Sequence, residues 1–235
     1  MSVEDNVHSG HRKRMKNAML EHGLDGFNEH QLLEILLFFA KPQGDTNPTA
    51  HELIRAFGTL RGVLEADYED LLKVKGIGEN AASLIKFAQM FSGRYLCASC
   101  FDGDALHFGD TLALRRYYEG VFLGVKDEQI RAMLFDDELN MIKEQMLMEG
   151  TIGKVELSTR KFADFVVKNN CSRVVIAHNH PNGPGIPSKD DIAATKYLFG
   201  VLDAIEIELL DHIIVGRTGS VSLRTSGHTE IFGNK

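Results

Sequence analysis

The spacing of apolar residues divides the chain into two regions with different predicted secondary structure. In the first region, apolar positions recur every three or four residues, which is the period of an amphipathic helix. Strand-like alternation is missing there, so we expect an all-α N-terminal domain over residues 1–95. The helices are predicted within residues 10–23, 28–40, 48–58, 68–74 and 79–91.

The second region contains β-rich runs separated by amphipathic helical stretches. The runs lie at residues 130–137, 174–180 and 206–216, and the helical stretches at 158–169 and 188–203. Strands that alternate with helices are typical of a sheet covered by helices, so we expect an α/β domain over residues 105–235. Residues 92–110 are irregular and rich in small residues, which predicts a linker.

Composition and charge exclude several classes of protein. Hydrophobic residues at 43% and charged residues at 25% are ordinary globular values. The net charge of −7, from 26 basic and 33 acidic residues, argues against a protein that coats nucleic acid through bulk electrostatics. The chain opens on a polar segment, and its longest apolar run, ILLFFA at 35–40, is far shorter than the roughly 20 residues that span a bilayer. Three cysteines cannot form a disulfide framework, so we expect a cytoplasmic protein without membrane association.

The stretch KGIGENAA at residues 75–82 matches the glycine pattern of a dinucleotide-binding loop through Gly76, Gly78 and Ala81. That function requires a preceding strand within a βαβ unit, whereas a predicted helix precedes these glycines. We instead expect two short helices joined by a glycine hairpin. Gly76 and Gly78 would adopt backbone conformations that other residues resist, and Ile77 would pack between the helices.

The longer stretch LLKVKGIGENAASLI resembles a helix-hairpin-helix module, which contacts the DNA backbone without sequence preference. The amides that open the second helix could hold a phosphate oxygen there. The resemblance implies DNA contacts through Lys73, Lys75, Gly76, Ile77 and Gly78, with Lys86 close by. Such hairpins also serve as protein-contact modules, and residues 1–93 are slightly acidic, with 10 basic and 13 acidic residues. Both interpretations stay open.

Cys97 and Cys100 have the spacing of half a structural zinc site or of a redox couple. A cysteine-based zinc site uses four ligands, and the sequence offers only Cys171 and scattered histidines in addition. We therefore interpret the pair as thiols of the linker.

Two histidines stand at the end of a predicted strand in SRVVIAHNHP. Alternation along a strand places His178 and His180 on one face, together with Val174 and Ile176. Two neighbouring imidazoles are poor core material unless they are paired, but they are well placed to bind one cation. A turn rich in proline and glycine follows them.

Ser188 and Asp191 follow that turn at the predicted start of a helix. Ser-x-x-Asp is an ordinary capping pattern, which accounts for Asp191 without a metal but leaves the two histidines unexplained. Two histidines and an aspartate, with water in the fourth position, are a ligand set of open catalytic zinc sites. The sequence has no G-x-S-x-G or Walker A motif, and HELIR has Arg55 where the H-E-x-x-H motif requires its second histidine.

The segment HNHPNGPGIPSKDD, followed by LLDHIIVG, resembles the JAMM (MPN+) metallopeptidase domain. Nearly the whole chain is similar to the RadC family, through EHGLDGFNEHQLLEILLFF, FGTLRGVLEADYEDLLKVKGIG and EGTIGKVELSTRKF. The resemblance implies an α/β, cytidine-deaminase-like domain with a central mixed sheet flanked by helices, preceded by an all-α helix-hairpin-helix domain.

The same resemblance implies roles for individual residues. One Zn²⁺ per chain would be held by His178, His180 and Asp191. Ser188 would stabilise the oxyanion of the reaction. The catalytic glutamate of that domain precedes a buried strand upstream of the histidines, which nominates Glu128 in DEQIRAMLFDD, with Glu149 in MEGTIG as the competitor.

Two functions from different classes follow. The first is a zinc-dependent hydrolase of peptide or isopeptide bonds that the helix-hairpin-helix brings to its place of action on DNA. The second is a DNA-binding accessory protein in repair or recombination, with a structural or vestigial metal. A binding protein needs no open coordination position beside a spare carboxylate such as Glu128, which favours the hydrolase. The sequence specifies neither the peptide or protein substrate nor the oligomeric state.

Overall fold

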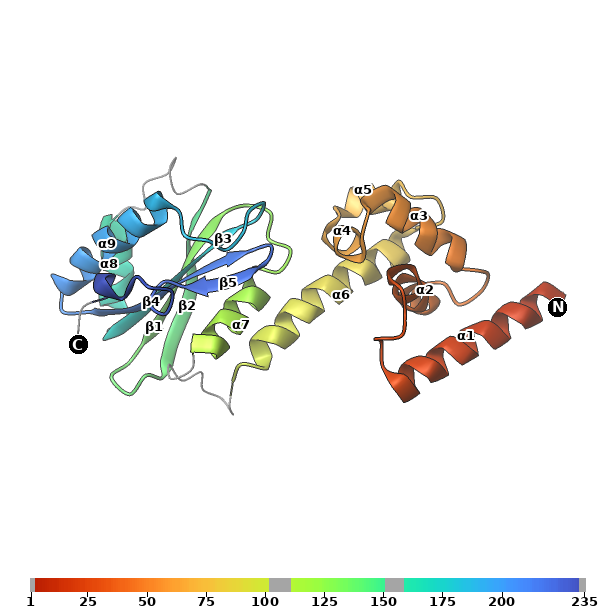
Figure 1. Cartoon of the computed structure of the whole chain (residues 1–235), viewed down its shortest axis with the longest axis horizontal. Coiled ribbons are helices and arrows are strands. Elements are labelled where there is room, and N and C mark those ends of the chain that lie inside the picture. Colours follow the sequence, from red (N-terminus) through yellow and green to blue (C-terminus); the bar gives the residue numbers. More distant parts are fainter. Residues whose placement is uncertain (1–2, 102–110, 151–158, 233–235) are drawn as a thin grey trace. The chain divides into compact units, whose positions relative to one another are not determined.

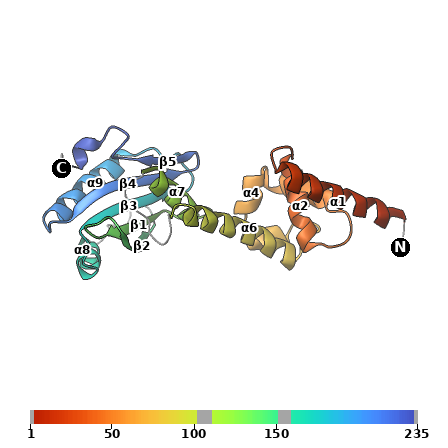
Figure 2. The same cartoon turned by 90° about the horizontal axis from the view of Figure 1, so that it is seen from below.

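The structure is a computed structural model that describes residues 3–101, 111–150 and 159–232. The chain divides into two compact units, Met1–Phe91 and Ser92–Lys235. Figure 1 and Figure 2 show the elements of each unit from two directions. Among the described residues, none of the helices combines the length and the hydrophobicity that crossing a bilayer requires.

The helix α6 (Glu79–Ala98) crosses the division between the units. The prediction of an irregular linker from residue 92 onward is therefore wrong for its first seven residues, Ser92–Ala98. Their helix persists because Gly93 and Cys97 pack closely against a neighbouring helix of the C-terminal unit. Residues 102–110 of the predicted linker, including the predicted domain start at residue 105, lie outside the described residues.

The described part of the N-terminal unit is helical, as the apolar spacing predicts. Its elements are α1 (Val3–His22), α2 (Glu29–Ala40), α3 (Asn47–Phe57), α4 (Leu60–Glu65), α5 (Tyr68–Leu72) and the first part of α6. Asn28 is the N-cap residue of α2, and its main-chain N donates to Gln31 Oε1 at 2.9 Å. The sequence prediction missed α4 because its 6 residues are too few to establish a helical period. The apolar faces of these helices meet in a core that fully buries Leu33, Leu37, Leu53, Leu71 and Ile85.

In the described residues of the C-terminal unit, five strands form one mixed sheet in the order β2-β1-β3-β4-β5. The strands are β1 (Gln129–Phe135), β2 (Met141–Glu149), β3 (Arg173–His180), β4 (Glu208–Gly216) and β5 (Gly219–Ser222). The pair β3 and β4 is parallel, and the other neighbours are antiparallel. The prediction of a central mixed sheet flanked by helices is confirmed, and β1, β3 and β4 lie where the sequence predicts them.

Helices cover both faces of this sheet (Figure 1). On one face lie α8 (Thr159–Lys168) and α9 (Lys189–Asp203), and on the other lies α7 (Thr111–Val121). Successive residues of β3 therefore enter different cores, with Val174 and Ile176 facing α8 and α9, and Val175 and Ala177 facing α7. The predicted helical stretches are confirmed as α8 and α9, although residue 158 lies outside the described residues.

The sequence prediction missed β2, β5 and α7. Apart from Ile142, the sequence of β2, MIKEQMLME, consists of residues that favour helices in isolation. It forms a strand because the antiparallel partner β1 offers a ladder of backbone hydrogen bonds, and this tertiary pairing overrides local preference. The strand β5 has only 4 residues, too few for a clear alternation.

Replacing Gly120 with alanine is expected to destabilise the C-terminal unit. A Cβ atom at Gly120 would lie 2.7 Å from the carbonyl oxygen of Gly93 and 2.9 Å from Cys97 Sγ, so α6 and α7 would have to separate. We expect the free energy of unfolding to fall by about 1–3 kcal/mol, as for other overpacked cores. Urea denaturation of the full chain measures this change. Gly200→Ala on α9 is the control, because a Cβ atom there meets no atom within 4 Å; equal effects of the two substitutions would contradict the packing argument.

Candidate metal centre

The two histidines of the HNHP motif lie at the C-terminal end of β3. They are two residues apart on a strand, so both project towards the face that α9 covers, the face to which Ile176 also points. His178 is 1% exposed, and His180 is partly exposed at the edge of a cavity. The arrangement agrees with the prediction that these side chains share a face.

Asp191 approaches the histidines from the first turn of α9. Ser188 occupies the N-cap position, where Ser188 N donates to Asp191 Oδ2 at 2.7 Å and Asp191 N donates to Ser188 Oγ at 3.1 Å. The capping interpretation of this pair is thus correct, but it does not use the whole carboxylate. Asp191 Oδ1 lies 3.1 Å from His178 Nε2, so one side chain both caps the helix and faces the histidines.

Three side-chain groups converge to form a group that could hold a metal ion. His178 Nε2 lies 2.9 Å from His180 Nε2 and 3.1 Å from Asp191 Oδ1, and His180 Nε2 lies 3.4 Å from Asp191 Oδ2. Metal–ligand bonds of about 2.0–2.2 Å in a tetrahedral site separate neighbouring ligand atoms by about 3.3–3.6 Å. The longest observed separation, 3.4 Å, falls in that range, and the other two, 2.9 and 3.1 Å, are slightly shorter. In the part of the chain that the structure describes, His178, His180 and Asp191 are the one group of histidine, cysteine or acidic side chains that lie close enough together to hold a metal ion.

Charge and hydrogen bonding favour a carboxylate at Asp191. Burial raises its pKa, but hydrogen bonds with His178 and His180 lower it more, so that the pKa lies well below its ordinary value. When its ring is protonated, His180 can donate to Asp191, and this hydrogen bond is the main reason why the pKa of His180 is raised. The site therefore concentrates negative charge where a cation would bind.

The orientation of His180 leaves a lone pair for that cation. His180 Nδ1 lies 3.0 Å from the carbonyl oxygen of Pro184. A carbonyl oxygen only accepts hydrogen bonds, so Nδ1 carries the proton, and Nε2 of the neutral ring is unprotonated. An unprotonated Nε2 is what a metal ligand requires.

The turn between His180 and α9 is fixed by main-chain contacts with the β4–β5 hairpin. Arg217 N donates to the carbonyl oxygen of Gly183 at 2.8 Å. A Cβ atom at Gly216 would lie 2.0 Å from Gly185 N, so only glycine allows the turn to approach β4 this closely. These contacts hold the Pro184 carbonyl that orients His180.

A cavity of about 550 Å³ opens beside the three groups. Its lining residues include Glu128, His180, Ser188, Asp190 and Asp191. Glu128 stands immediately before β1, which pairs with β3 in a register that places Ile130 opposite His178. Extending this antiparallel register by two residues brings Glu128 opposite His180. The charge of Glu128 adds to the raised pKa of His180, which agrees with this placement.

Asn179, between the two histidines, clamps the backbone on both sides of Glu128. It is 3% exposed. Its Oδ1 accepts from Gln129 N at 2.7 Å, and its Nδ2 donates to the carbonyl oxygen of Asp127 at 3.0 Å. Gly150 N donates to the carbonyl oxygen of Glu128 itself at 2.7 Å. The strand that carries the histidines therefore also fixes Glu128, a contact that sequence reasoning did not find.

Glu149, the competing glutamate, has a different environment. It lies at the end of β2 with its side chain exposed, and its Oε1 accepts a long hydrogen bond of 3.4 Å from Gln129 Nε2. Gly150, the next residue, lines the cavity, whereas Glu149 is not among the lining residues.

Sequence reasoning also missed two buried polar residues behind the ligands. His212 on β4 contacts His178 Nδ1 through its Nε2 at 2.8 Å, and Thr195 on α9 contacts His212 Nδ1 at 2.6 Å. Burial lowers the pKa of His212 well below its ordinary value, so the ring is neutral. The signal in the sequence was a histidine in the middle of the apolar strand LLDHIIVG.

The residues of the predicted hairpin lie between α5 and α6. Gly76 has a φ of 91°, and Ile77 is 7% exposed within the N-terminal core, as predicted. Gly78 does not have a positive φ, and a Cβ atom there would meet nothing within 4 Å, so the prediction that this position requires glycine is wrong. A single glycine at the turn is enough to reverse the chain.

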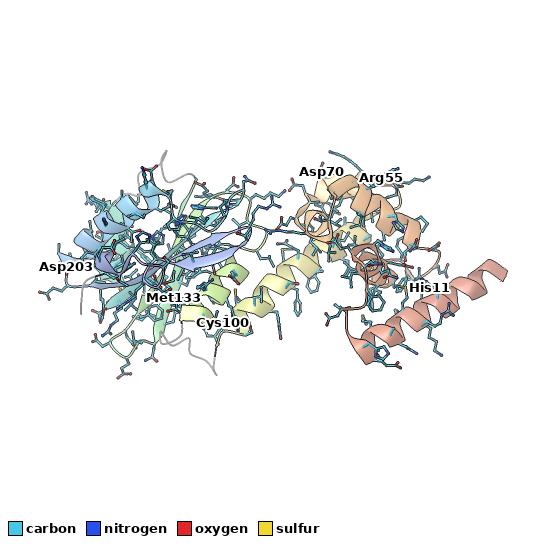
Figure 3. The ribbon with its side chains drawn as sticks, in the orientation of Figure 1. His11, Arg55, Asp70, Cys100, Met133 and Asp203 are labelled. Carbon is cyan, nitrogen blue, oxygen red and sulfur yellow. The ribbon has the colours of Figure 1, made fainter. Side chains whose placement is uncertain are left out.

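The lysines near this turn differ in their contacts. Lys73 Nζ lies 2.7 Å from Asp70 Oδ1, and Lys86 Nζ donates to the carbonyl oxygens of Leu64 and Ala66. Lys75 is exposed. Several charged side chains line a shallow depression near this turn, and Figure 3 labels two of these residues, Arg55 and Asp70.

The prediction that both cysteines of CASC belong to an irregular linker is wrong for Cys97, whereas Cys100 lies in the turn that follows α6. Cys97 lies on α6, is 8% exposed, and donates to the carbonyl oxygen of Tyr117 at 3.4 Å. Burial raises the pKa of its thiol. Cys97 is therefore a packing residue of the contact between α6 and α7, because it fills the space opposite Gly120.

Comparison with known proteins places this geometry in context. A family model described as "RadC-like JAB domain" matches residues 110–228, which include all three converging groups and Glu128. The chain is also 30% identical over 218 residues to the protein named "UPF0758 protein SPO0054" of Ruegeria pomeroyi. That match covers 93% of this chain and 96% of the relative.

Proposed function

Since the chain belongs to the RadC family through its RadC-like JAB domain, we propose that it is a zinc-dependent hydrolase of peptide or isopeptide bonds. The observation that carries the proposal is the convergence of His178, His180 and Asp191 beside a cavity that a further carboxylate, Glu128, also lines. Two imidazoles and one carboxylate leave a coordination position for water, as in catalytic rather than structural zinc sites.

Two residues that line the cavity, Glu128 and Ser188, have separate parts in the proposed reaction. A bound zinc ion supplies Lewis acidity, which activates water near neutral pH and polarises an amide carbonyl. Glu128 takes the proton from the attacking water and returns it to the leaving amine. Ser188 Oγ accepts from Asp191 N, so this contact does not use the hydroxyl proton, and Ser188 donates it to the developing oxyanion. Such a donor typically lowers the barrier by about 2.7–4 kcal/mol.

The hydrolase proposal is tested with the purified full chain. We expect about one zinc ion per chain and cleavage of peptides or of lysine isopeptides that stops on chelation and returns with zinc. Elemental analysis measures the metal, and mass spectrometry of a mixed peptide and isopeptide pool detects new termini. Stoichiometric zinc without cleavage of either class would favour the accessory-protein alternative.

We also propose that the N-terminal unit contacts DNA without sequence preference, as a helix-hairpin-helix module. The specific support is the glycine turn at Gly76, the burial of Ile77 beneath it, and the exposure of Lys75 next to the start of α6. Lys73 and Lys86 are engaged within the unit, so few phosphate contacts are available from the turn. Affinity is therefore expected to be weak and strongly dependent on salt.

Replacing Lys75 with glutamine is expected to weaken duplex binding equally for different sequences. The plot of log affinity against log salt has a negative slope, and losing one phosphate contact makes that slope shallower by about 1. Fluorescence anisotropy over a series of salt concentrations measures this slope. Lys168→Gln is the control, because it makes the same change in charge at an exposed position in the other unit. Binding that responds to Lys168→Gln, or that does not depend on salt, would contradict the proposal.

A further inference from the structure

His212 is buried directly behind one of the proposed metal ligands without being a ligand itself. It lies on β4, which runs parallel to the histidine strand β3, and is 3% exposed. Its Nε2 is 2.8 Å from His178 Nδ1, the ring nitrogen that faces away from the converging groups. Its other nitrogen, Nδ1, is 2.6 Å from Thr195 Oγ1 on α9.

The direction of this hydrogen-bond chain is set at its far end. Thr195 Oγ1 donates to the main-chain carbonyl oxygen of Asp191 at 2.6 Å, and a carbonyl oxygen only accepts. A hydroxyl has one proton, so Thr195 Oγ1 must accept from His212 Nδ1. Neutral His212 then has an unprotonated Nε2, which accepts the Nδ1 proton of His178. His178 is left with an unprotonated Nε2 that points at His180 and Asp191.

We propose that Thr195 and His212 are positioning residues that fix the tautomer of His178, so that its Nε2 lone pair faces the metal. This inference rests on the proposed metal site. The reverse direction of the chain would put a proton on His178 Nε2, where it would exclude a cation. The chain also closes on itself, because the carbonyl that sets its direction belongs to Asp191, another of the ligands.

If Thr195 and His212 only filled space, their hydrogen bonds would not need to run in the direction that leaves His178 Nε2 unprotonated. His180, whose Nδ1 proton goes to the Pro184 carbonyl instead, reaches the same tautomer by a route independent of His212. The two ligands can therefore be perturbed separately, and His180 serves as an internal control for His178.

Thr195→Val tests the inference because valine has nearly the shape of threonine but no hydroxyl, while Thr195→Ser keeps the hydroxyl. We expect Thr195→Val to weaken zinc binding about 10–100-fold, the usual effect of losing a group that orients a ligand, and Thr195→Ser to restore most of it. Competition with a chromophoric chelator measures the affinity. If Thr195→Val fails to fold, His212→Gln takes its place, because glutamine can still offer an acceptor to His178 Nδ1. We then expect His212→Gln to bind zinc more tightly than His212→Leu.

A second measurement reads the tautomer without metal. In the zinc-free full chain at mildly alkaline pH, ¹⁵N ring spectra should show the proton of His178 on Nδ1. In Thr195→Val, the His178 signals should become a mixture of tautomers, while those of His180 stay unchanged. A His178 proton on Nε2 in the unsubstituted chain, or zinc affinity unaltered in Thr195→Val, would overturn the inference. If the unsubstituted chain shows the expected tautomer but does not bind zinc, the proposed metal site itself would be overturned.

Discussion

Replacing His178 or Asp191 with alanine is expected to abolish stoichiometric zinc binding while most of the fold is kept. Each substitution removes one of three protein ligands, and loss of a group that merely orients a ligand already costs about 10–100-fold in affinity. We therefore expect a loss of more than about 100-fold. His178 and Asp191 are buried, but the fold is expected to persist because they lie at the end of β3 and at the start of α9 and belong to neither of the apolar clusters that pack on the sheet.

Elemental analysis after dialysis and chelator competition measure this loss, and circular dichroism checks the fold. Asp191→Ala also removes the acceptor of Ser188 N, so its stability is expected to fall by about 1 kcal/mol through the lost cap. Asp190→Ala is the matched control, because Asp190 is a neighbouring carboxylate that lines the same cavity but is not part of the group. Equal losses of zinc in Asp190→Ala and Asp191→Ala would contradict the assignment of the ligands.

Replacing Glu128 with glutamine is expected to abolish most hydrolysis while the zinc content is unchanged. Glutamine keeps the shape of the side chain but cannot accept a proton, so a rate loss of about 10²–10⁴-fold is expected. The measurement is the cleavage rate on whichever peptide or isopeptide substrate the pool identifies, with zinc content measured on the same samples.

Glu149→Gln is the control for that experiment. Its side chain is exposed at the end of β2 and contacts Gln129, so we expect a mild effect. A large loss of rate in Glu149→Gln, with Glu128→Gln close to the unsubstituted chain, would transfer the role of base to Glu149. No loss in either variant would leave the hydrolase mechanism without a base.

The elements that could be predicted from the sequence are those whose local pattern and tertiary environment agree. The N-terminal helices follow the apolar period, and β3 follows an apolar run that ends in two histidines. For β2 the two levels disagree, because MIKEQMLME is a strand only while β1 supplies its partner. Ser92–Ala98 is helical against its small-residue composition, because Gly93 and Cys97 pack on α7.

The same distinction applies to the candidate site. The ligands lie within 14 residues of one another, so a motif could nominate them together. Thr195 and His212 support the site only because β3 and β4 are parallel in a particular register, with Ile176 opposite His212. The clamp by Asn179 likewise depends on the pairing of β1 with β3. Such contacts are set by strand order, which no local pattern specifies.

In the turn that joins His180 to α9, exposed side chains can be altered by evolution or by a protein engineer, whereas the length of the turn must stay constant. Main-chain atoms anchor it, through Arg217 N on the Gly183 carbonyl and through the close approach of Gly185 to Gly216. The side chains of Asn182 and Ile186 are exposed, and Asn182 lines the cavity. Substitutions at these two positions can therefore reshape the rim of the cavity without displacing His180, whereas insertion of a residue would break the anchoring contacts. Libraries that seek a new specificity should vary the side chains of this turn and keep its length.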